Sequence, residues 1–200
     1  MKLSKKLLLL TAVALFTFGL SGNALADDVE DYINEALQFY KDGQFSEAVS
    51  SLNFAEQLIQ QKKSSGLEAF LPGPLAGWEA QAATSQAASS AMLGGGISAE
   101  REYNKGDSYV HINIVADSPM LQAVMMMFQN PMFAASDGGK MERIGKQKAI
   151  VKFDPNTKEG EIQIVVANRF LVTIEGNEVT DKDLKAYAQA IDFDKMAQLP

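Results

Sequence analysis

Hydrophobic residues follow three different patterns along the 200-residue chain. Residues 7–20 are almost entirely apolar. Between residues 28 and 62, apolar positions recur every three or four residues, which is the spacing of a helix with one apolar stripe. From residue 97 onward they alternate with polar positions, which is typical of strands. The pattern therefore predicts an apolar leader, a helical region and then a region dominated by β-structure.

The leader has the three parts of a secretory signal peptide. Lys2, Lys5 and Lys6 precede the apolar run, and Ala24-Leu25-Ala26 supplies small residues at a cleavage site. A membrane anchor is the alternative, but the 14-residue run is shorter than the roughly 20 residues that span a bilayer. We therefore expect residues 1–26 to be a signal peptide, the protein to be exported to the periplasm, and no transmembrane segment to remain after cleavage.

Residues 27–63 are predicted to form an antiparallel helical hairpin. Lys41-Asp42-Gly43-Gln44 interrupts the helical pattern, and Gly43 can adopt the left-handed conformation that ends a helix. The apolar stripe of the first helix comprises Val29, Ile33, Ala36, Leu37 and Tyr40, and that of the second comprises Phe45, Ala48, Val49, Leu52, Ala55 and Ile59.

The stretch from Phe39 to Ala48, followed by Leu52 and Ala55, resembles the turn and second helix of a tetratricopeptide repeat. The resemblance implies that Ala48 and Ala55 allow the two helices to approach closely. Arrays of such repeats usually need about three copies to bury a continuous core. A lone unit is therefore expected to dock on its own C-terminal domain or to offer Tyr40, Phe45 and Leu52 to a partner; a purely structural hairpin is the alternative.

Residues 64–96 are predicted to be a joint between two domains. Ser64-Ser65-Gly66 is expected to end the hairpin, and the segment from Leu71 to Trp78 contains too much proline and glycine for a helix. The Ala/Ser/Gln-rich tract from Ala80 to Met92 is expected to be helical, and Gly94-Gly95-Gly96 to stop it. No strand precedes these glycines, so we expect no dinucleotide cofactor.

Residues 97–200 are predicted to form an antiparallel α+β domain, in which helices pack against the sheet. Strands are expected at 97–105, 108–116, 141–144, 147–153, 161–167 and 170–175. Helices are expected at 119–129 and after Thr180, with a break near Asp192. The element order from the Pro-rich segment and Trp78 to the C-terminal helix resembles that of PsbP-like domains, which share a fold but no single chemistry.

Composition narrows the range of functions. The chain contains 18 basic and 25 acidic residues, so its formal charge is −7, and removal of a leader with three lysines and no acid leaves −10. This acidity argues against a nucleic-acid partner. The chain has no cysteine, which excludes thiol catalysis, disulfides and thiolate metal sites.

Catalytic motifs are missing from the sequence. The only histidine, His111, is expected on the polar face of its strand beside Tyr109 and Asn113, and no G-x-S-x-G or S-x-x-K motif accompanies it. Acidic residues fall mainly on expected exposed helix faces, and none is set in an apolar pocket that would raise its pKa. We therefore expect no enzymatic activity and no catalytic residue.

Methionine is concentrated in and after the helix expected at 119–129. Met120, Met127 and Met132, with His111, are candidate ligands of Cu(I) or Ag(I). Packing of flexible thioethers against the sheet is the alternative. Because this helix is apolar nearly all round, we expect both of its sides to be covered, by the sheet and by the hairpin, a second subunit or a lipid. Met120, Met126 and Met127 are accordingly candidate interface residues.

The sequence taken as a whole favours an exported, non-enzymatic protein that acts by protein–protein contact or as an assembly factor, through a protein partner or by self-association. The candidate interface comprises Tyr40, Phe45 and Leu52 together with the Met-rich helix. A carrier of lipids or small hydrophobic ligands is one alternative, and Met-based Cu(I) or Ag(I) binding is another.

Overall fold

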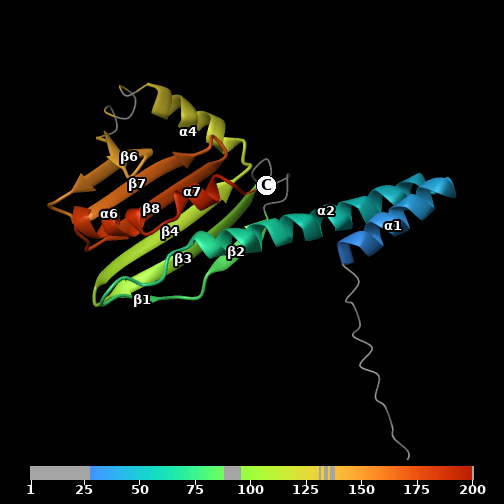
Figure 1. The fold of residues 1–200 in the computed structure, drawn as a ribbon, viewed down its shortest axis with the longest axis horizontal. Coiled ribbons are helices and arrows are strands. Elements are labelled where there is room, and N and C mark those ends of the chain that lie inside the picture. The colour runs from blue at the N-terminus through green and yellow to red at the C-terminus, as the bar shows by residue number, and fades with distance from the viewer. Residues whose placement is uncertain (1–27, 88–95, 131, 133–134, 136–137, 200) are drawn as a thin grey trace, which may run out of the picture.

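The computed structural model describes residues 28–87, 96–130, 132, 135 and 138–199 (Figure 1). It confirms an α+β fold, in which an N-terminal helix pair precedes an antiparallel eight-stranded sheet with helices packed on it. The expected signal peptide lies outside the described residues. Within the described part of the chain, no helix has both the length and the apolar character needed to cross a membrane.

The helical hairpin comprises α1 (Asp28–Lys41) and α2 (Phe45–Leu67). Gly43 has the expected left-handed backbone, with φ of 75°, and the amide of Gln44 donates to the carbonyl of Phe39 across the turn. The expectation that Ser64-Ser65-Gly66 ends the hairpin is wrong. The helix α2 continues to Leu67, with the hydroxyls of Ser64 and Ser65 donating to the carbonyl of Gln61 inside it, and a 3-10 turn, η1 (Glu68–Phe70), follows.

The sheet contains every strand expected after residue 97. The strands are β3 (Ile97–Lys105), β4 (Ser108–Ala116), β5 (Lys140–Ile144), β6 (Gln147–Asp154), β7 (Glu159–Val166) and β8 (Phe170–Asn177). The order of these six strands is β3-β4-β8-β7-β6-β5, so the hairpin β3–β4 meets the four-strand meander β5–β8 through the pairing of β4 with β8. Ile112 lies opposite Ile174, which lies opposite Ile162, and all three side chains are fully buried.

Two short strands replace the helix that was expected from Ala80 to Met92. They are β1 (Glu79–Ala80) and β2 (Thr84–Ala87), and both pair antiparallel with β3; residues 88–92 lie outside the described residues. The free edge of β3 offers unpaired amide and carbonyl groups. Pairing with this edge outweighs the weak helix propensity of an exposed Ala/Ser/Gln tract.

One face of the sheet carries the core. The C-terminal part of α2, the segment 67–78, α6 (Asp181–Gln189) and α7 (Phe193–Met196) all cover this face (Figure 1). The Trp78 ring meets Tyr187 edge-on at 5.4 Å, and the Tyr103 and Tyr187 rings lie 4.5 Å apart. The Tyr103 hydroxyl donates to the carbonyl of Pro72 at 2.7 Å. The Pro-rich part of the predicted joint is therefore packed on the sheet as part of the core.

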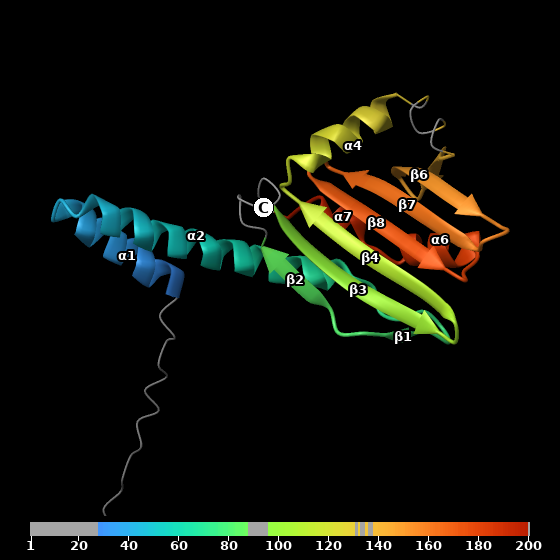
Figure 2. The same cartoon turned by 180° about the vertical axis from the view of Figure 1, so that it is seen from behind.

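The other face of the sheet is open over much of its area, as Figure 2 shows. The helix α4 (Met120–Gln129) has the predicted extent and lies at one end of the strands, away from the α1–α2 hairpin in both views. The final helices also agree with the sequence. Thr180 forms a reciprocal capping box with Asp183, and Asp192 caps α7 after the predicted break.

Candidate protein-interaction surface

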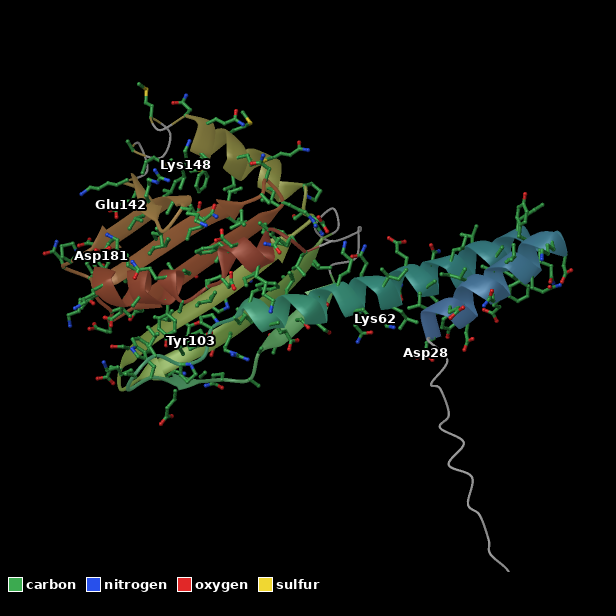
Figure 3. The ribbon with its side chains drawn as sticks, in the orientation of Figure 1. Asp28, Lys62, Tyr103, Glu142, Lys148 and Asp181 are labelled. Atoms are coloured by element: carbon green, nitrogen blue, oxygen red, sulfur yellow. The ribbon has the colours of Figure 1, made fainter. Side chains whose placement is uncertain are left out.

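The α1–α2 hairpin projects from the sheet. In Figures 1 and 2, α1 and the first half of α2 extend beyond the strands, whereas the end of α2 runs onto β2 and β3. Figure 3 labels Asp28, where α1 begins, and Lys62, on α2 close to the sheet; these two residues mark the base of the hairpin. The turn between the helices forms its distant tip. Most of the hairpin surface therefore faces away from the core of the protein.

Small side chains fill the space between α1 and α2. Ala36, Ala48 and Ala55 are 3–5% exposed. Ser51 is also buried, and its hydroxyl donates to a carboxylate oxygen of Glu35 at 2.7 Å. Helices that meet through such small residues lie close together, and this leaves no room between them for larger side chains.

The large apolar side chains consequently lie outside. On α1 these are Ile33, Leu37 and Tyr40, which lie at positions −3, +1 and +4 relative to Ala36. On α2, Phe45, Val49 and Leu52 lie at the same positions relative to Ala48, and Ile59 lies four residues after Ala55. In two antiparallel helices, residues at the same offset from the helix contact point to the same side of the hairpin. Both sets of apolar side chains therefore lie on one side of it. We call this surface the hairpin face; it comprises Ile33, Leu37, Tyr40, Phe45, Val49, Leu52 and Ile59, which are 40–64% exposed.

The hairpin face unites the three hairpin residues that the sequence singled out. Tyr40 and Phe45 meet across the turn with their ring centroids 5.8 Å apart, and Leu52 follows two turns along α2. The structure adds that these side chains point away from the helix contact, which the small residues occupy. On the opposite side of the hairpin, Tyr32 and Phe54 stack at 5.4 Å, and Phe54 is 51% exposed.

Charged side chains lie toward both ends of the hairpin face. Lys41 lies at the tip, four residues after Leu37. Glu30 and Glu56 lie toward the base and are exposed; Glu30 is at the edge, whereas Glu56 lies inside the face between Leu52 and Ile59. Helical spacing puts all three on the same side as the apolar residues. The hairpin face is therefore positive at the tip and negative in its base half, beyond which Lys63, four residues after Ile59, is paired with Asp117.

The Met-rich helix α4 forms a second, smaller apolar surface. Leu121 is buried, Met127 is half-buried, and Met126 and Met132 are 65% and 78% exposed. The side chain of Met120 lies outside the described part of the structure. The hairpin does not cover the other side of this helix, because α4 sits at the end of the sheet, where only one side meets the strands. Cover by a second subunit or a lipid stays a prediction.

His111 lies on the open face of the sheet, as predicted. Its Nε2 is 3.3 Å from a carboxylate oxygen of Glu100, and its ring stacks on Tyr109. The strand register adds a polar row that the sequence did not reveal, because the β4–β8 pairing could not be foreseen. The row crosses five strands and comprises Glu102, His111, Glu175, Glu161 and Lys152.

Metal-binding clusters of the usual kind are absent from the described residues, among which no group of three or more His, Cys, Asp or Glu side chains could hold an ion. The three methionines proposed as soft-metal ligands do not all have described side chains. The Cu(I) or Ag(I) site therefore stays a prediction.

Two hollows bear on ligand binding. The larger, about 610 Å³, is open and lies at the ends of β6, β7 and β8, where Asp154, Glu159, Glu161 and Glu175 line it with Lys152. The smaller, about 270 Å³, lies between α2 and the sheet; it is lined by Leu67, Ile97, Phe170 and Leu199 and bordered by Lys62, Lys63 and Arg169. Charged walls make the first a poor site for a lipid, whereas the second is largely apolar.

The second hollow borders an ion-pair network that joins distant elements. Asp117, at the end of β4, accepts hydrogen bonds from Lys63 at 2.8 Å and from Nε of Arg169 at 2.9 Å. The Arg169 guanidinium, together with Lys63, holds the pKa of Asp117 below its usual value. Arg169 also donates to the carbonyl of Leu199 at 2.8 Å. The network fixes α2, β4, β8 and the C-terminal segment to one another.

Comparison with protein-family models, with curated proteins and with solved structures found no match to this chain.

Proposed function

We propose that this chain is an exported, non-enzymatic protein that works by binding another protein through the hairpin face. A single observation carries the proposal. Of the ten large apolar side chains that are exposed in the described part of the chain, eight lie on the hairpin, and seven of these make up the hairpin face. Exposed apolar residues scattered singly over a surface are ordinary, whereas a contiguous patch of this size marks an interaction site.

The size of the patch supports this proposal. Seven large side chains that are 40–64% exposed amount to roughly 700 Å² of accessible surface. The largest apolar patch on a typical monomer covers about 300–600 Å². Leaving such an area in contact with water costs stability, because each Å² of apolar surface removed from water contributes about 25 cal/mol. A covered hairpin face avoids that cost.

The attachment of the hairpin also suits a binding role. The helix α2 is continuous from the tip to the sheet, and Leu67, Phe70 and Leu71 at its end are buried in the core. The hairpin is therefore joined to the sheet by a continuous helix whose end is packed in the core. Pre-ordering of this kind lowers the entropy that is lost when two proteins associate.

The exposed side of α4 provides an additional contact point. Met126 and Met132 are flexible, polarisable side chains that adapt to a partner surface. Their smaller exposed area makes them secondary to the hairpin face. If they contribute, Met126→Lys weakens partner binding less than a charge at the centre of the hairpin face does.

The proposal is tested by photo-crosslinking in the cells that produce the protein. A photoreactive amino acid replaces Leu37 on the hairpin face and, as the control, Lys182, an exposed residue of α6. The proposal predicts discrete protein adducts from position 37 and none from position 182. Equal labelling from both positions, or no adduct from position 37, contradicts it.

Carriage of a small hydrophobic ligand is the second candidate, and one observation favours it. The 270 Å³ hollow has a largely apolar lining, which suits the hydrocarbon chain of a small ligand. Dodecanoate is a suitable probe. A ligand that binds only the folded state raises the melting temperature, so an unchanged melting temperature at millimolar dodecanoate contradicts this candidate.

A further inference from the structure

We infer that the occupant of the hairpin face is a second copy of this chain, and that two hairpins associate antiparallel as a four-helix bundle with two-fold symmetry. This inference rests on the proposed function, because it names the partner of the same surface. Three features of the hairpin carry it: the exposed area, the distribution of charge and the position of the sheet.

The exposed area suits a dimer. A standard interface buries about 800 Å² on each partner, and the apolar part of the hairpin face alone supplies roughly 700 Å². In a two-fold dimer the same patch on both copies must be complementary to itself. The hairpin face suits this condition because the residues at its centre, around Leu52, are apolar, whereas Glu56 lies one turn from that centre toward the base. Two stacked hairpins would enclose these side chains as the core of a four-helix bundle.

The charges of the hairpin face select the antiparallel orientation. When the tip of one hairpin lies over the base of the other, Lys41 approaches Glu30 and Glu56 of the second copy. The parallel orientation brings Lys41 against its own symmetry mate and the glutamates against theirs. Opposite charges across an interface favour one register, and like charges oppose the alternative.

The position of the sheet favours the same orientation. The sheet lies at the base of the hairpin, and the tip is free (Figures 1 and 2). An antiparallel bundle places the two sheets at opposite ends of the assembly, where they do not collide. A parallel bundle brings both sheets to one end, beside each other.

The opposite side of the hairpin supplies a matched control. Leu52 is 52% exposed on the hairpin face, and Phe54 is 51% exposed on the other side of the same helix. A lysine at either position therefore introduces the same charge at similar exposure. Only the lysine at position 52 would be enclosed by a second copy.

The test is sedimentation equilibrium of protein purified from cells that express the full chain. The unsubstituted protein is expected to be a dimer at micromolar concentration. Leu52→Lys is expected to raise the dimer dissociation constant at least ~100-fold, because it buries a charge at the centre of the interface. Phe54→Lys is expected to leave the dissociation constant within about threefold. Circular dichroism confirms that both variants are folded.

Orientation is tested by single cysteines, since the chain has none of its own. Leu52 is midway between Phe45 and Ile59, so the two-fold axis of an antiparallel bundle passes close to it. Leu52→Cys is expected to form an intermolecular disulfide on mild oxidation, whereas Tyr40→Cys and Phe54→Cys are not. Disulfide formation by Tyr40→Cys alone overturns the antiparallel orientation.

A monomeric chain at 100 µM overturns the inference, and so does a dimer that Leu52→Lys and Phe54→Lys weaken equally. These failures are distinguishable from failure of the proposed function. Crosslinked adducts from position 37 that contain a different protein retain the contact role and overturn the second copy as the partner. Absence of any adduct from position 37, together with a monomeric chain, overturns both.

Discussion

The rings of Tyr40 and Phe45 lie 5.8 Å apart at the tip of the hairpin, yet they are 64% and 62% exposed. Tyr40 is near the end of α1 and Phe45 begins α2, so their contact joins the apolar stripes of the two helices. The tight turn at Gly43 makes this contact possible. The contact converts two helix stripes into one surface, and that surface is the basis of the functional proposal.

Exposed and core phenylalanines are expected to differ sharply in their contribution to stability. Phe45→Ala is expected to lower the free energy of unfolding by less than about 1 kcal/mol in the monomer, because the ring is 62% exposed. Phe70→Ala, at a position 5% exposed, is expected to cost about 3–5 kcal/mol. Urea unfolding measures both. Equal losses would mean that Phe45 is part of the fold of the monomer.

Two glycines are expected to respond oppositely to alanine. A Cβ at Gly160 would lie 2.6 Å from Leu184 and 2.9 Å from the carbonyl of Lys152, so Gly160→Ala is expected to destabilise by about 1–3 kcal/mol. Gly66, in α2, has open space around it, and Gly66→Ala is expected to stabilise by up to about 1 kcal/mol. Thermal unfolding compares them. Stabilisation by Gly160→Ala would contradict the packing of α6 on the sheet.

Two buried tyrosines are expected to lower the free energy of unfolding at alkaline pH. Burial raises the pKa of Tyr103 and of Tyr187 to about 12, from 10.0 for a free side chain. Between pH 10 and 12 the folded protein therefore retains protons that the unfolded chain releases. The contribution of the two tyrosines to the free energy of unfolding is complete below pH 10 and falls as the pH rises to 12.

For Tyr103 the loss over that range is up to about 3 kcal/mol. Tyr103→Phe is expected to reduce the slope of unfolding free energy against pH between 10 and 12, although it also removes the hydrogen bond to Pro72 and lowers stability at neutral pH. Urea unfolding at a series of pH values provides the slope. An unchanged slope in this variant would contradict the burial of the hydroxyl.

Asp117 combines an ion-pair network with a left-handed backbone, its φ being 55°. Because its pKa is lowered in the folded state, its contribution is present above the unfolded pKa and is lost as the pH falls. Asp117→Asn keeps a residue that tolerates this backbone and is expected to cost about 1 kcal/mol. Asp117→Ala adds backbone strain and is expected to cost about 1 kcal/mol more. Equal costs would exclude the backbone contribution.

Local signals in the sequence predicted much of the fold. The alternation in β3 and β4 gave their limits correctly, and Thr180 gave the start of α6, because both depend on neighbouring residues alone. The helix expected from Ala80 to Met92 failed because the edge of β3, a distant element, determines the conformation of that tract. The pairing of β4 with β8 was not predictable for the same reason.

The hairpin face was predicted only in part. Tyr40, Phe45 and Leu52 were identified as candidates from a resemblance and from helical spacing. Whether an apolar stripe faces its partner helix depends on which residues make the contact, and here Ala36, Ala48 and Ala55 make it. Helical spacing alone does not show whether an apolar stripe faces the partner helix or lies one residue further around the helix, toward solvent. The exposure of the hairpin face therefore required the structure.

The central claim is that the hairpin face is covered when the protein works, and hydroxyl-radical footprinting in intact cells measures this coverage directly. Tyr40 and Phe45 report on the hairpin face, Phe54 on the other side of the hairpin, and Tyr103 on the core. A covered face predicts that Tyr40 and Phe45 are oxidised several-fold more slowly than Phe54, despite their greater exposure in the single chain. Oxidation of Tyr40 and Phe45 at least as fast as that of Phe54 would contradict the account.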